Sequence, residues 1–275
     1  MPRRMRNLLR FSRLYLRVGM KQALAAIKAE FPEGTFPTLQ SLVDRNDGMY
    51  AHDHPAHYFY VAYSALACIQ SCPQEKLGET FHSVLDLPCG HGRVLRVLKA
   101  AFPEASFTAC DLDEQAVDFC SRTFGATGIY SNTNPRMIRI RAKFDLIWVG
   151  SLFTHLNCDR WSHFLDLFRS VLTKDGLLFF STHGNFVAER LERFSAFYSL
   201  SSEQVQDIKA QYARGGFGYV EYRDAEGYGI SLSAAEWVKR TLRLHSLDLV
   251  AFMPKQWDNH HDIWAVSCGM GDSCF

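Results

Sequence analysis

The sequence lacks a surplus of charge of either sign, a long apolar run and a leader-like start. Its 30 Lys and Arg residues almost balance its 29 Asp and Glu residues, and a formal net charge of +1 does not favour nucleic-acid binding by the whole molecule. No apolar run approaches the about 18 residues of a membrane span, and no signal-peptide pattern stands at the start. We therefore expect a cytoplasmic protein without a nucleic-acid partner.

The sequence also lacks a cysteine pair with metal-ligand spacing. None of its eight cysteines forms a C-x-x-C pair, which favours small buried thiols in a reducing compartment over a zinc site or a set of disulfides. His52, Asp53, His54 and His57 are close in sequence, but Pro55 interrupts the helical spacing that would align them as ligands. We predict no metal site, and we predict a helix from this turn to about Ile69.

The start of the chain predicts a basic amphipathic helix. Its cationic residues recur at steps of three and four, so they form one stripe on a helix: Arg3, Arg6, Arg10, Arg13, Arg17 and Lys21. Two interpretations are open. The favoured one is a helix that packs on its own domain or on a second copy in a homodimer. The other is a helix that lies on an anionic surface such as the inner membrane.

The segment from Val84 to Leu95 is the most informative part of the chain. A short apolar β-type run ends in Asp86 and then turns through Gly90 and Gly92 into an apolar helix. Glycines let the backbone approach a ligand that a Cβ atom would keep away. About twenty residues later a second strand ends in Asp111, where an acid normally receives ribose hydroxyls. This order predicts a nucleoside-binding βαβ unit.

The details of the loop indicate which nucleoside it binds. A dinucleotide-binding loop has a third glycine where this chain has Leu95, and Asp86 would repel a diphosphate but suits an amino-acid ammonium group. The arrangement resembles motif I of the class I S-adenosylmethionine (SAM)-dependent methyltransferases, with Pro88 in the place of the first glycine. Further segments resemble the family's fourth strand, fifth strand and closing hairpin, in the right order: residues 144–156, 171–181, and 247–252 with 262–266.

The resemblance, which covers about residues 80–270, implies a fold and a domain plan. The expected fold is α/β, a Rossmann-like seven-stranded mostly parallel sheet with an antiparallel last strand. Residues 1–78 would form a helical extension and cofactor lid, and residues 79–275 the SAM-dependent methyltransferase domain. Residues 185–232 are a long insertion after strand five whose glycines and aromatics favour a mobile substrate lid. A capping-box pattern from Ser233 to Glu236 predicts where the next helix begins.

The resemblance also implies a cofactor site for SAM at the carboxyl ends of the strands. Asp86 would lie near the ammonium group, and Asp111 would accept both ribose hydroxyls. The family's usual acid for the adenine amine is missing, and an amide oxygen from Asn132 is the expected substitute. The full set of predicted cofactor residues is Asp86, Pro88, Cys89, Gly90, Gly92, Asp111, Leu112, Asn132, Gly150 and Ser151.

Two histidines follow the ends of strands four and five, His155 and His183. If the acceptor is a hydroxyl, a base near neutral pKa assists the transfer, and these are the two catalytic candidates. Each has an alternative structural interpretation, as a residue that packs a helix or bonds a turn. Tyr50, His57 and Tyr58 are candidates for the cofactor lid, with helix packing as the alternative. Candidate substrate contacts are Tyr58, Tyr219, Tyr222, Tyr228, Trp257 and His260.

The sequence therefore predicts methyl transfer from SAM to a small-molecule or glycan acceptor, with a hydroxyl favoured. It is similar to bacterial methyltransferases of secondary metabolism and surface-polysaccharide modification. Base methylation of nucleic acid is disfavoured, because Gly150-Ser151-Leu152-Phe153 stands where an Asn/Asp-Pro-Pro-aromatic motif is needed. The remaining alternatives are a protein or peptide methyltransferase and a SAM-binding module without catalysis.

Overall fold

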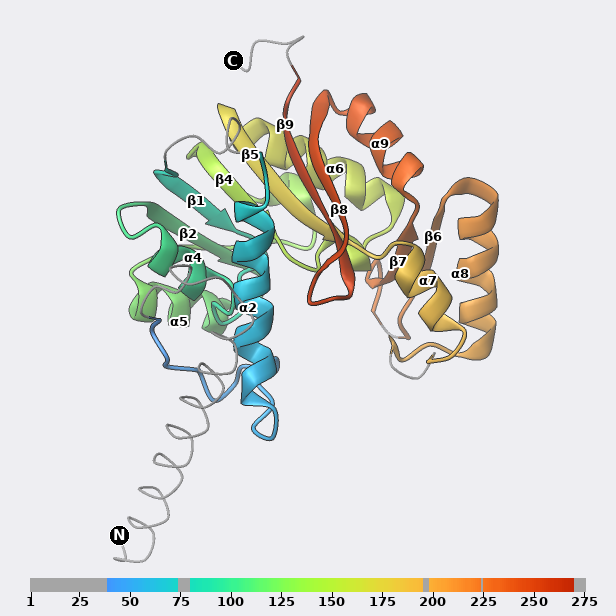
Figure 1. Cartoon of the computed structure of the whole chain (residues 1–275), viewed down its shortest axis with the longest axis horizontal. Coiled ribbons are helices and arrows are strands. Elements are labelled where there is room, and N and C mark those ends of the chain that lie inside the picture. The colour runs from blue at the N-terminus through green and yellow to red at the C-terminus, as the bar shows by residue number, and fades with distance from the viewer. Residues whose placement is uncertain (1–38, 74–79, 195–197, 224, 270–275) are drawn as a thin grey trace, which may run out of the picture.

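A computed structural model describes residues 39–73, 80–194, 198–223 and 225–269 of the chain. Figure 1 shows a twisted sheet between helices, with a small lobe beyond one end. The basic N-terminal segment lies outside the described residues. The elements are α2 (Pro55–Gln70), β1 (Ser83–Asp86), α4 (Leu95–Ala101), β2 (Ser106–Asp111), α5 (Glu114–Phe124), β3 (Thr127–Tyr130), η1 (Pro135–Met137), β4 (Phe144–Val149), η2 (Phe153–His155), α6 (Cys158–Val171), β5 (Leu172–Thr182), α7 (Asn185–Leu191), α8 (Ser202–Gly215), β6 (Phe217–Glu221), β7 (Gly229–Ser233), α9 (Ala235–Leu244), β8 (Leu247–Trp257) and β9 (His261–Cys268).

Seven strands form the main sheet in the order β3-β2-β1-β4-β5-β9-β8. The first five are parallel to their neighbours. β9 runs antiparallel to both β5 and β8. The predicted Rossmann-like seven-stranded mostly parallel sheet with an antiparallel last strand is therefore confirmed. The order reverses between β1 and β4, and open sheets of this kind bind ligands at such a switch point.

Each face of the sheet is covered by helices (Figure 1), with α2, α4 and α5 on one side and α6 and α9 on the other. Alternate residues of β4 divide between the two cores: Leu146 and Trp148 pack towards α2 and α4, and Ile147 and Val149 towards α6. Strands buried on both faces are apolar nearly throughout, which is why the β1 and β4 segments were easy to recognise in the sequence.

Helix α2 connects two distant parts of the chain. It begins with Pro55 in its first turn, where the missing N–H costs nothing, and it confirms the helix predicted to about Ile69. The indole N–H of Trp257 donates to the carbonyl of Val61 at 2.9 Å. Asn259 donates to the Tyr60 hydroxyl at 2.6 Å. These bonds hold the β8–β9 turn against α2.

The predicted insertion folds as α7, α8 and the hairpin β6–β7, and it forms the lobe at one end of the sheet (Figure 1). An ideal Cβ on Gly218 would lie 2.2 Å from the carbonyl oxygen of Ile208, so this glycine allows β6 to approach α8 closely. The lobe has a core of its own, which includes Val187, Leu191, Ile208, Ile230 and Leu232. The segment is thus regular structure with a packed core, and its movement as a substrate lid stays a prediction.

The capping box predicted at Ser233 is wrong. Ser233 is the last residue of β7, and helix α9 begins after Ala234, which makes no side-chain cap. The N–H of Ser233 donates to the carbonyl of His183 at 2.9 Å, and that of Ala234 donates to Gly216 at 2.7 Å. Strand pairing therefore determines the backbone of Ser233, and its side chain is not free to begin the helix.

No helix among the described residues is long and apolar enough to cross a membrane.

Candidate functional site

The two predicted glycines of the loop after β1 have different surroundings. Gly90 has φ +47°, and an ideal Cβ on it would meet no atom within 4 Å, so its surface is open to a ligand. Gly92 has φ +73°, and a Cβ there would lie 2.5 Å from the ring of Phe124. The first glycine therefore leaves space in front of the loop, and the second lets the loop pack on α5. The Gly90 N–H donates to Asp111 Oδ2 at 2.7 Å, which joins the ends of β1 and β2.

Asp86 has the environment expected of a residue that binds a cation. It is 1% exposed, and its Oδ2 has no hydrogen-bond partner among the described residues. Burial raises its pKa well above the usual value, and the negative charge of Asp111 raises it further. An ammonium group would relieve both effects. The orphaned oxygen and the open face of Gly90 therefore fit the amino-acid part of SAM.

The predicted ribose and adenine side is more exposed. Oδ1 of Asp111 accepts the backbone N–H of Asp113 at 3.0 Å, and the adjacent Leu112 side chain is 57% exposed. The Asn132 amide oxygen accepts the N–H of Asn134 at 2.9 Å in a local turn. These residues lie at the carboxyl ends of β2 and β3, where the predicted roles put them. Whether they contact adenine stays a prediction.

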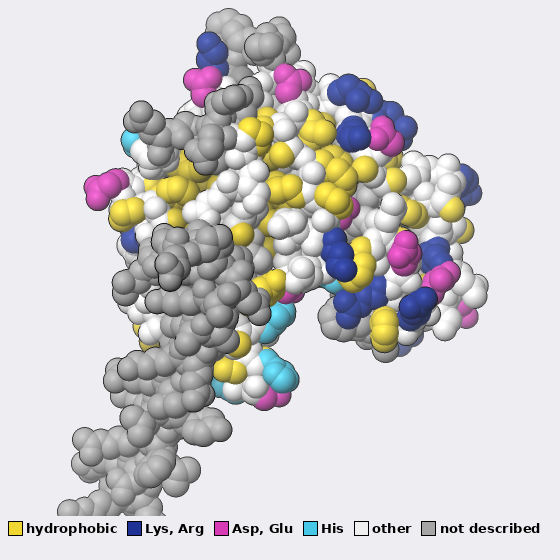
Figure 2. All heavy atoms as spheres, in the orientation of Figure 1, with side chains coloured by type: hydrophobic (Ala, Val, Ile, Leu, Met, Phe, Trp, Pro, Cys, Tyr) yellow, Lys and Arg dark blue, Asp and Glu magenta, His cyan; other side chains and the backbone are white. Residues whose placement is uncertain are grey.

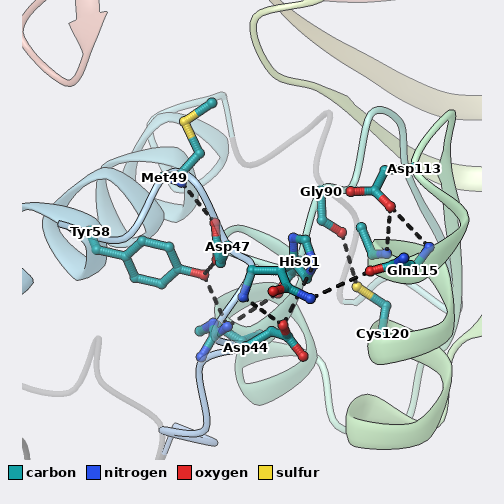
Figure 3. Close-up of polar contacts among 12 residues, drawn as sticks. Asp44, Asp47, Met49, Tyr58, Gly90, His91, Asp113, Gln115 and Cys120 are labelled. Carbon is teal, nitrogen blue, oxygen red and sulfur yellow. Dashed lines mark hydrogen bonds and ion pairs between the residues drawn. The ribbon is translucent and has the colours of Figure 1, made fainter. Parts of the chain in front are cut away.

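A turn before α2 lies beside the glycine loop after β1, as Figure 3 shows. The Asn46 amide donates to Gln115 on α5 at 3.4 Å, and Asp44 Oδ1 lies 4.0 Å from Nε2 of His91. Asp47 Oδ2 accepts the hydroxyl of Tyr58 at 2.6 Å (Figure 3). The segment predicted as a cofactor lid is thus joined to the glycine loop and to α5.

Tyr58 has a different place from the predicted substrate contact. Its side chain is 1% exposed, and its hydroxyl also accepts a hydrogen bond from the buried Arg96 at 3.0 Å. Arg96 in turn donates to the carbonyls of Gly92 and Leu42, both at 3.0 Å. Tyr58 therefore belongs to a buried network that links α2, the glycine loop and the preceding turn.

The two remaining loop residues in the prediction, Pro88 and Cys89, are buried or partly buried. The N–H of Cys89 donates to the carbonyl of Cys110 at 3.0 Å, which holds the loop against β2. A hydrogen bond with the Cys120 thiol and burial raise the pKa of the Cys89 thiol. A thiol kept neutral in this way is not an activated nucleophile.

The end of β4 forms a close-packed wall. An ideal Cβ on Gly150 would lie 2.8 Å from the Trp257 ring and 2.9 Å from Trp148, so only glycine fits. Ser151 has φ +61°, and its N–H donates to the hydroxyl of Ser181 on β5 at 2.8 Å. Trp257 is 2% exposed and packs in this wall. It therefore has a different place from the predicted substrate contact.

His155 lies beside the insertion. Its Nδ1 lies 2.7 Å from the carbonyl oxygen of Gly229, an acceptor, so Nδ1 carries the proton and Nε2 the lone pair. The ring stacks on Tyr228 with centroids 4.7 Å apart and 21° between planes, and Tyr222 is 6.1 Å away. Burial lowers the pKa of His155 below its usual value. The imidazole is therefore neutral and oriented.

His183 lies 6.4 Å from His155 between ring centroids, but its contacts differ. It is 3% exposed, and its Nε2 lies 3.1 Å from Nε2 of His261. His260 Nε2 lies 3.0 Å from the Tyr198 hydroxyl in the same group. The sequence prediction included His155, His183 and His260 but missed His261 and Tyr198. The adjacent pair His260-His261 was the available signal, and Tyr198 gave none.

Figure 2 shows the molecule hollowed between the lower part of α2 and the insertion lobe. β5 runs directly into α7 of that lobe, so the carboxyl ends of the parallel strands point towards it. Of the predicted substrate residues, Tyr222 and Tyr228 contact His155. Tyr219 lies partly buried on β6, where its N–H donates to Gln211.

Comparison with known proteins supports this interpretation of the fold and loop. Residues 85–178 match the family model described as "Methyltransferase domain". The fold is similar to a SAM-dependent methyltransferase from Clostridium acetobutylicum ATCC 824, with a TM-score of 0.51 and 15% identity over 76% of this chain and 90% of that one. For Streptomyces venezuelae DesVI the TM-score is 0.56 and the identity 13%, over 83% of this chain and 100% of that one. For an O-methyltransferase family protein from Burkholderia thailandensis the TM-score is 0.50 and the identity 12%, over 94% of this chain and 71% of that one.

Among curated proteins, no sequence matches this chain significantly. At these identities the solved structures show the fold alone, and the match of residues 85–178 to a methyltransferase domain indicates the activity. The sheet order, the glycine loop and the acids after β1 and β2 agree with both. Residues 85–178 therefore match a methyltransferase domain, and the fold around them is similar to that of SAM-dependent methyltransferases, which makes SAM the expected cofactor.

Proposed function

We propose that this protein transfers the methyl group of SAM to a hydroxyl oxygen of a small-molecule or glycan acceptor. The observation that carries the proposal is the state of His155, a neutral imidazole with Nδ1–H bonded to Gly229 and Nε2 left as a proton acceptor. A hydroxyl must lose its proton as it attacks, whereas a free amine or a thiolate needs no such base.

The residues divide the work between binding and proton transfer. Asp86, Gly90 and Asp111 would hold SAM, which would supply a methyl group carried on a positively charged sulfur. Nε2 of His155 takes the acceptor's proton while the acceptor oxygen forms its bond to the methyl carbon. Tyr228 holds the imidazole plane by stacking, and β7 holds it by the Gly229 carbonyl. His183 is the weaker candidate for the base, because its Nε2 faces His261.

Two arguments support the acceptor class. Tyr222 and Tyr228 lie beside His155, and tyrosine hydroxyls bond to polar ligands while the rings pack on them. The proposal also agrees with the fold's likeness to a protein described as an O-methyltransferase family member, although that likeness is too distant to carry it. A balanced net charge does not favour a nucleic-acid acceptor.

Release of S-adenosylhomocysteine (SAH) over a panel of sugars, phenols, lipids and peptides tests the proposal. With the acceptor so found, we expect His155→Ala to lower kcat about 10²- to 10⁴-fold with SAM affinity nearly unchanged. The wild-type rate should rise with pH through a pKa below 6.5, because burial lowers the pKa of His155, and then level off. A His155→Ala enzyme with wild-type turnover and the same pH profile would contradict the proposal.

A further inference from the structure

Three histidines gather on the acceptor side, apart from the glycine loop. His183 follows β5, and His260 and His261 lie at the β8–β9 turn. One ring nitrogen of each lies within 4.8 Å of those of the other two. Among the described residues, this is the one group of three or more His, Cys, Asp or Glu side chains with ligand atoms this close together. The histidines near the start of α2 are not part of it: His57 instead lies 2.9 Å from Asp258.

The hydrogen bonds of this group are incomplete. Nε2 of His183 and Nε2 of His261 face each other at 3.1 Å, so one proton at most lies between them. The Nδ1 atoms of both rings are buried and make no hydrogen bond of ordinary geometry with a described residue. An ion between the two facing Nε2 atoms would accept both lone pairs, and each Nδ1 would then carry the proton of its ring.

Neutral imidazole is the metal-ligating form of histidine. His183 is buried, and His260 and His261 are partly buried, which limits the access of competing water to the group.

The distances are close to those of a metal site. Zinc binds histidine nitrogen at about 2.0–2.1 Å, so two nitrogens of one tetrahedral site are about 3.3 Å apart. The His183–His261 pair already has a 3.1 Å separation, and a ring nitrogen of His260 lies within 4.8 Å of both. Imidazole ligands favour zinc and its first-row neighbours, and oxygen ligands favour magnesium.

We propose that His183, His260 and His261 bind a divalent transition-metal ion of the zinc type. The surrounding residues suit such a site, because the Tyr198 hydroxyl lies 3.0 Å from His260 Nε2 and its ring stacks on the imidazole. Residues that orient ligating histidines in this way are typical of metal sites. This proposal differs from the sequence analysis, which predicts no metal site.

The position of the site connects it with the acceptor. The His183 ring centroid is 6.4 Å from that of His155, so the ion lies on the side of the sheet ends where the acceptor is expected. A metal ion there would polarise the acceptor oxygen and assist His155 in removing its proton. That role rests on the proposed function, but the binding of the ion does not.

The test is a calorimetric titration of the full-length, tag-free protein with Zn²⁺ after treatment with a chelator. We expect one Zn²⁺ per chain in the wild type and no comparable binding of Mg²⁺. His260→Ala and His261→Gln should each weaken Zn²⁺ binding at least 10-fold, the scale of losing a group that a metal site depends on. His54→Ala is the matched control, because His54 is exposed and outside the group, and it should bind Zn²⁺ like the wild type.

Two further measurements make every outcome decisive. Co²⁺ added to the wild type should give the intense visible absorption of a four-coordinate nitrogen site, which does not depend on any variant folding. Thermal unfolding and SAM binding of each variant show whether it is folded. Absence of Zn²⁺ binding, equal binding by all variants, or loss of binding in His54→Ala alone would overturn the metal site. Failure of the wild type to bind SAM would instead contradict the proposed function.

Discussion

At the scale of single residues, the cofactor loop shows how glycines in one motif differ in role. The space in front of Gly90 is open, whereas Gly92 faces the Phe124 ring. Sequence alone presents them as two equivalent glycines. Their neighbours in the fold leave one open to the predicted ligand and make the other a packing contact, and the two predicted roles are separable by mutation.

We expect Gly90→Val to abolish SAM binding, because the branched side chain would occupy the ligand's space, and to lower the free energy of unfolding by about 1–3 kcal/mol through strain at φ +47°. Gly92→Ala is the matched comparison. It should lower the free energy of unfolding by at least the about 1–3 kcal/mol of a strained left-handed residue, since its Cβ would also lie 2.5 Å from Phe124. Calorimetry and urea unfolding measure the two effects. Wild-type SAM affinity in Gly90→Val would mean that the loop is not the cradle.

The proposed SAM site gives a reason for the buried carboxylate of Asp86. Burial and the neighbouring Asp111 raise its pKa, so the charged form is disfavoured in the free protein. An ammonium group of the ligand favours that charged form. Binding at low pH must therefore release a proton from Asp86, and SAM affinity is expected to increase with pH up to this raised pKa.

At the scale of elements, the hairpin β6–β7 positions His155, the proposed base, from outside the main sheet. Gly229 at the start of β7 accepts from His155, and Tyr228 just before it stacks on the ring. If His155 is the base, the insertion orients it through this hairpin. Its own core keeps that hairpin in place.

We expect Tyr228→Ala to lower kcat about 10-fold or more with SAM affinity unchanged, because the imidazole loses its stacked neighbour and its orientation. Tyr228→Phe retains the ring and should retain most of the rate. Steady-state kinetics with the identified acceptor, together with SAM titrations, separate these effects. Equal rates in the Ala and Phe variants would show that stacking does not orient His155.

The sequence predicted the elements whose signals are local. Asp86, the glycines and Asp111 follow apolar strands that are buried on both faces, so pattern and structure agree. The capping box predicted at Ser233 was wrong because such a box is a local signal, and the pairing of Ser233 with β6 overrode it. His261 and Tyr198 were missed because their partners are 78 and 62 residues away, a separation that only the fold closes.

At the scale of the whole molecule, the acceptor side holds four histidines whose pKa values are lowered by burial: His155, His183, His260 and His261. The unfolded chain binds protons at these groups near pH 6.5, and the folded chain does not. Unfolding therefore takes up protons as the pH falls below 6.5, and the free energy of unfolding falls by up to about 1.4 kcal/mol per pH unit for each histidine that stays neutral.

Two carboxyls act in the opposite direction. Burial raises the pKa values of Asp86 and Asp262 above 3.8, so they add stability as the pH falls towards that value. With four histidines against two carboxyls, we expect a net loss of stability between pH 6.5 and about 5. Urea unfolding of chelator-treated protein at several pH values measures it, and His261→Gln should reduce the slope. Stability that is constant or rises on acidification would contradict the prediction.

The central claim is that the ends of β1 and β2 form a SAM site, and calorimetric titration with SAM, SAH and NAD tests it most directly. We predict that the wild type binds SAM and SAH at one site and does not bind NAD. Asp111→Ala should weaken SAM binding by about 1.5–3 kcal/mol, the scale of lost hydrogen bonds to a charged group. Binding of NAD in preference to SAM, or an unchanged SAM dissociation constant in a folded Asp111→Ala protein, would contradict the account.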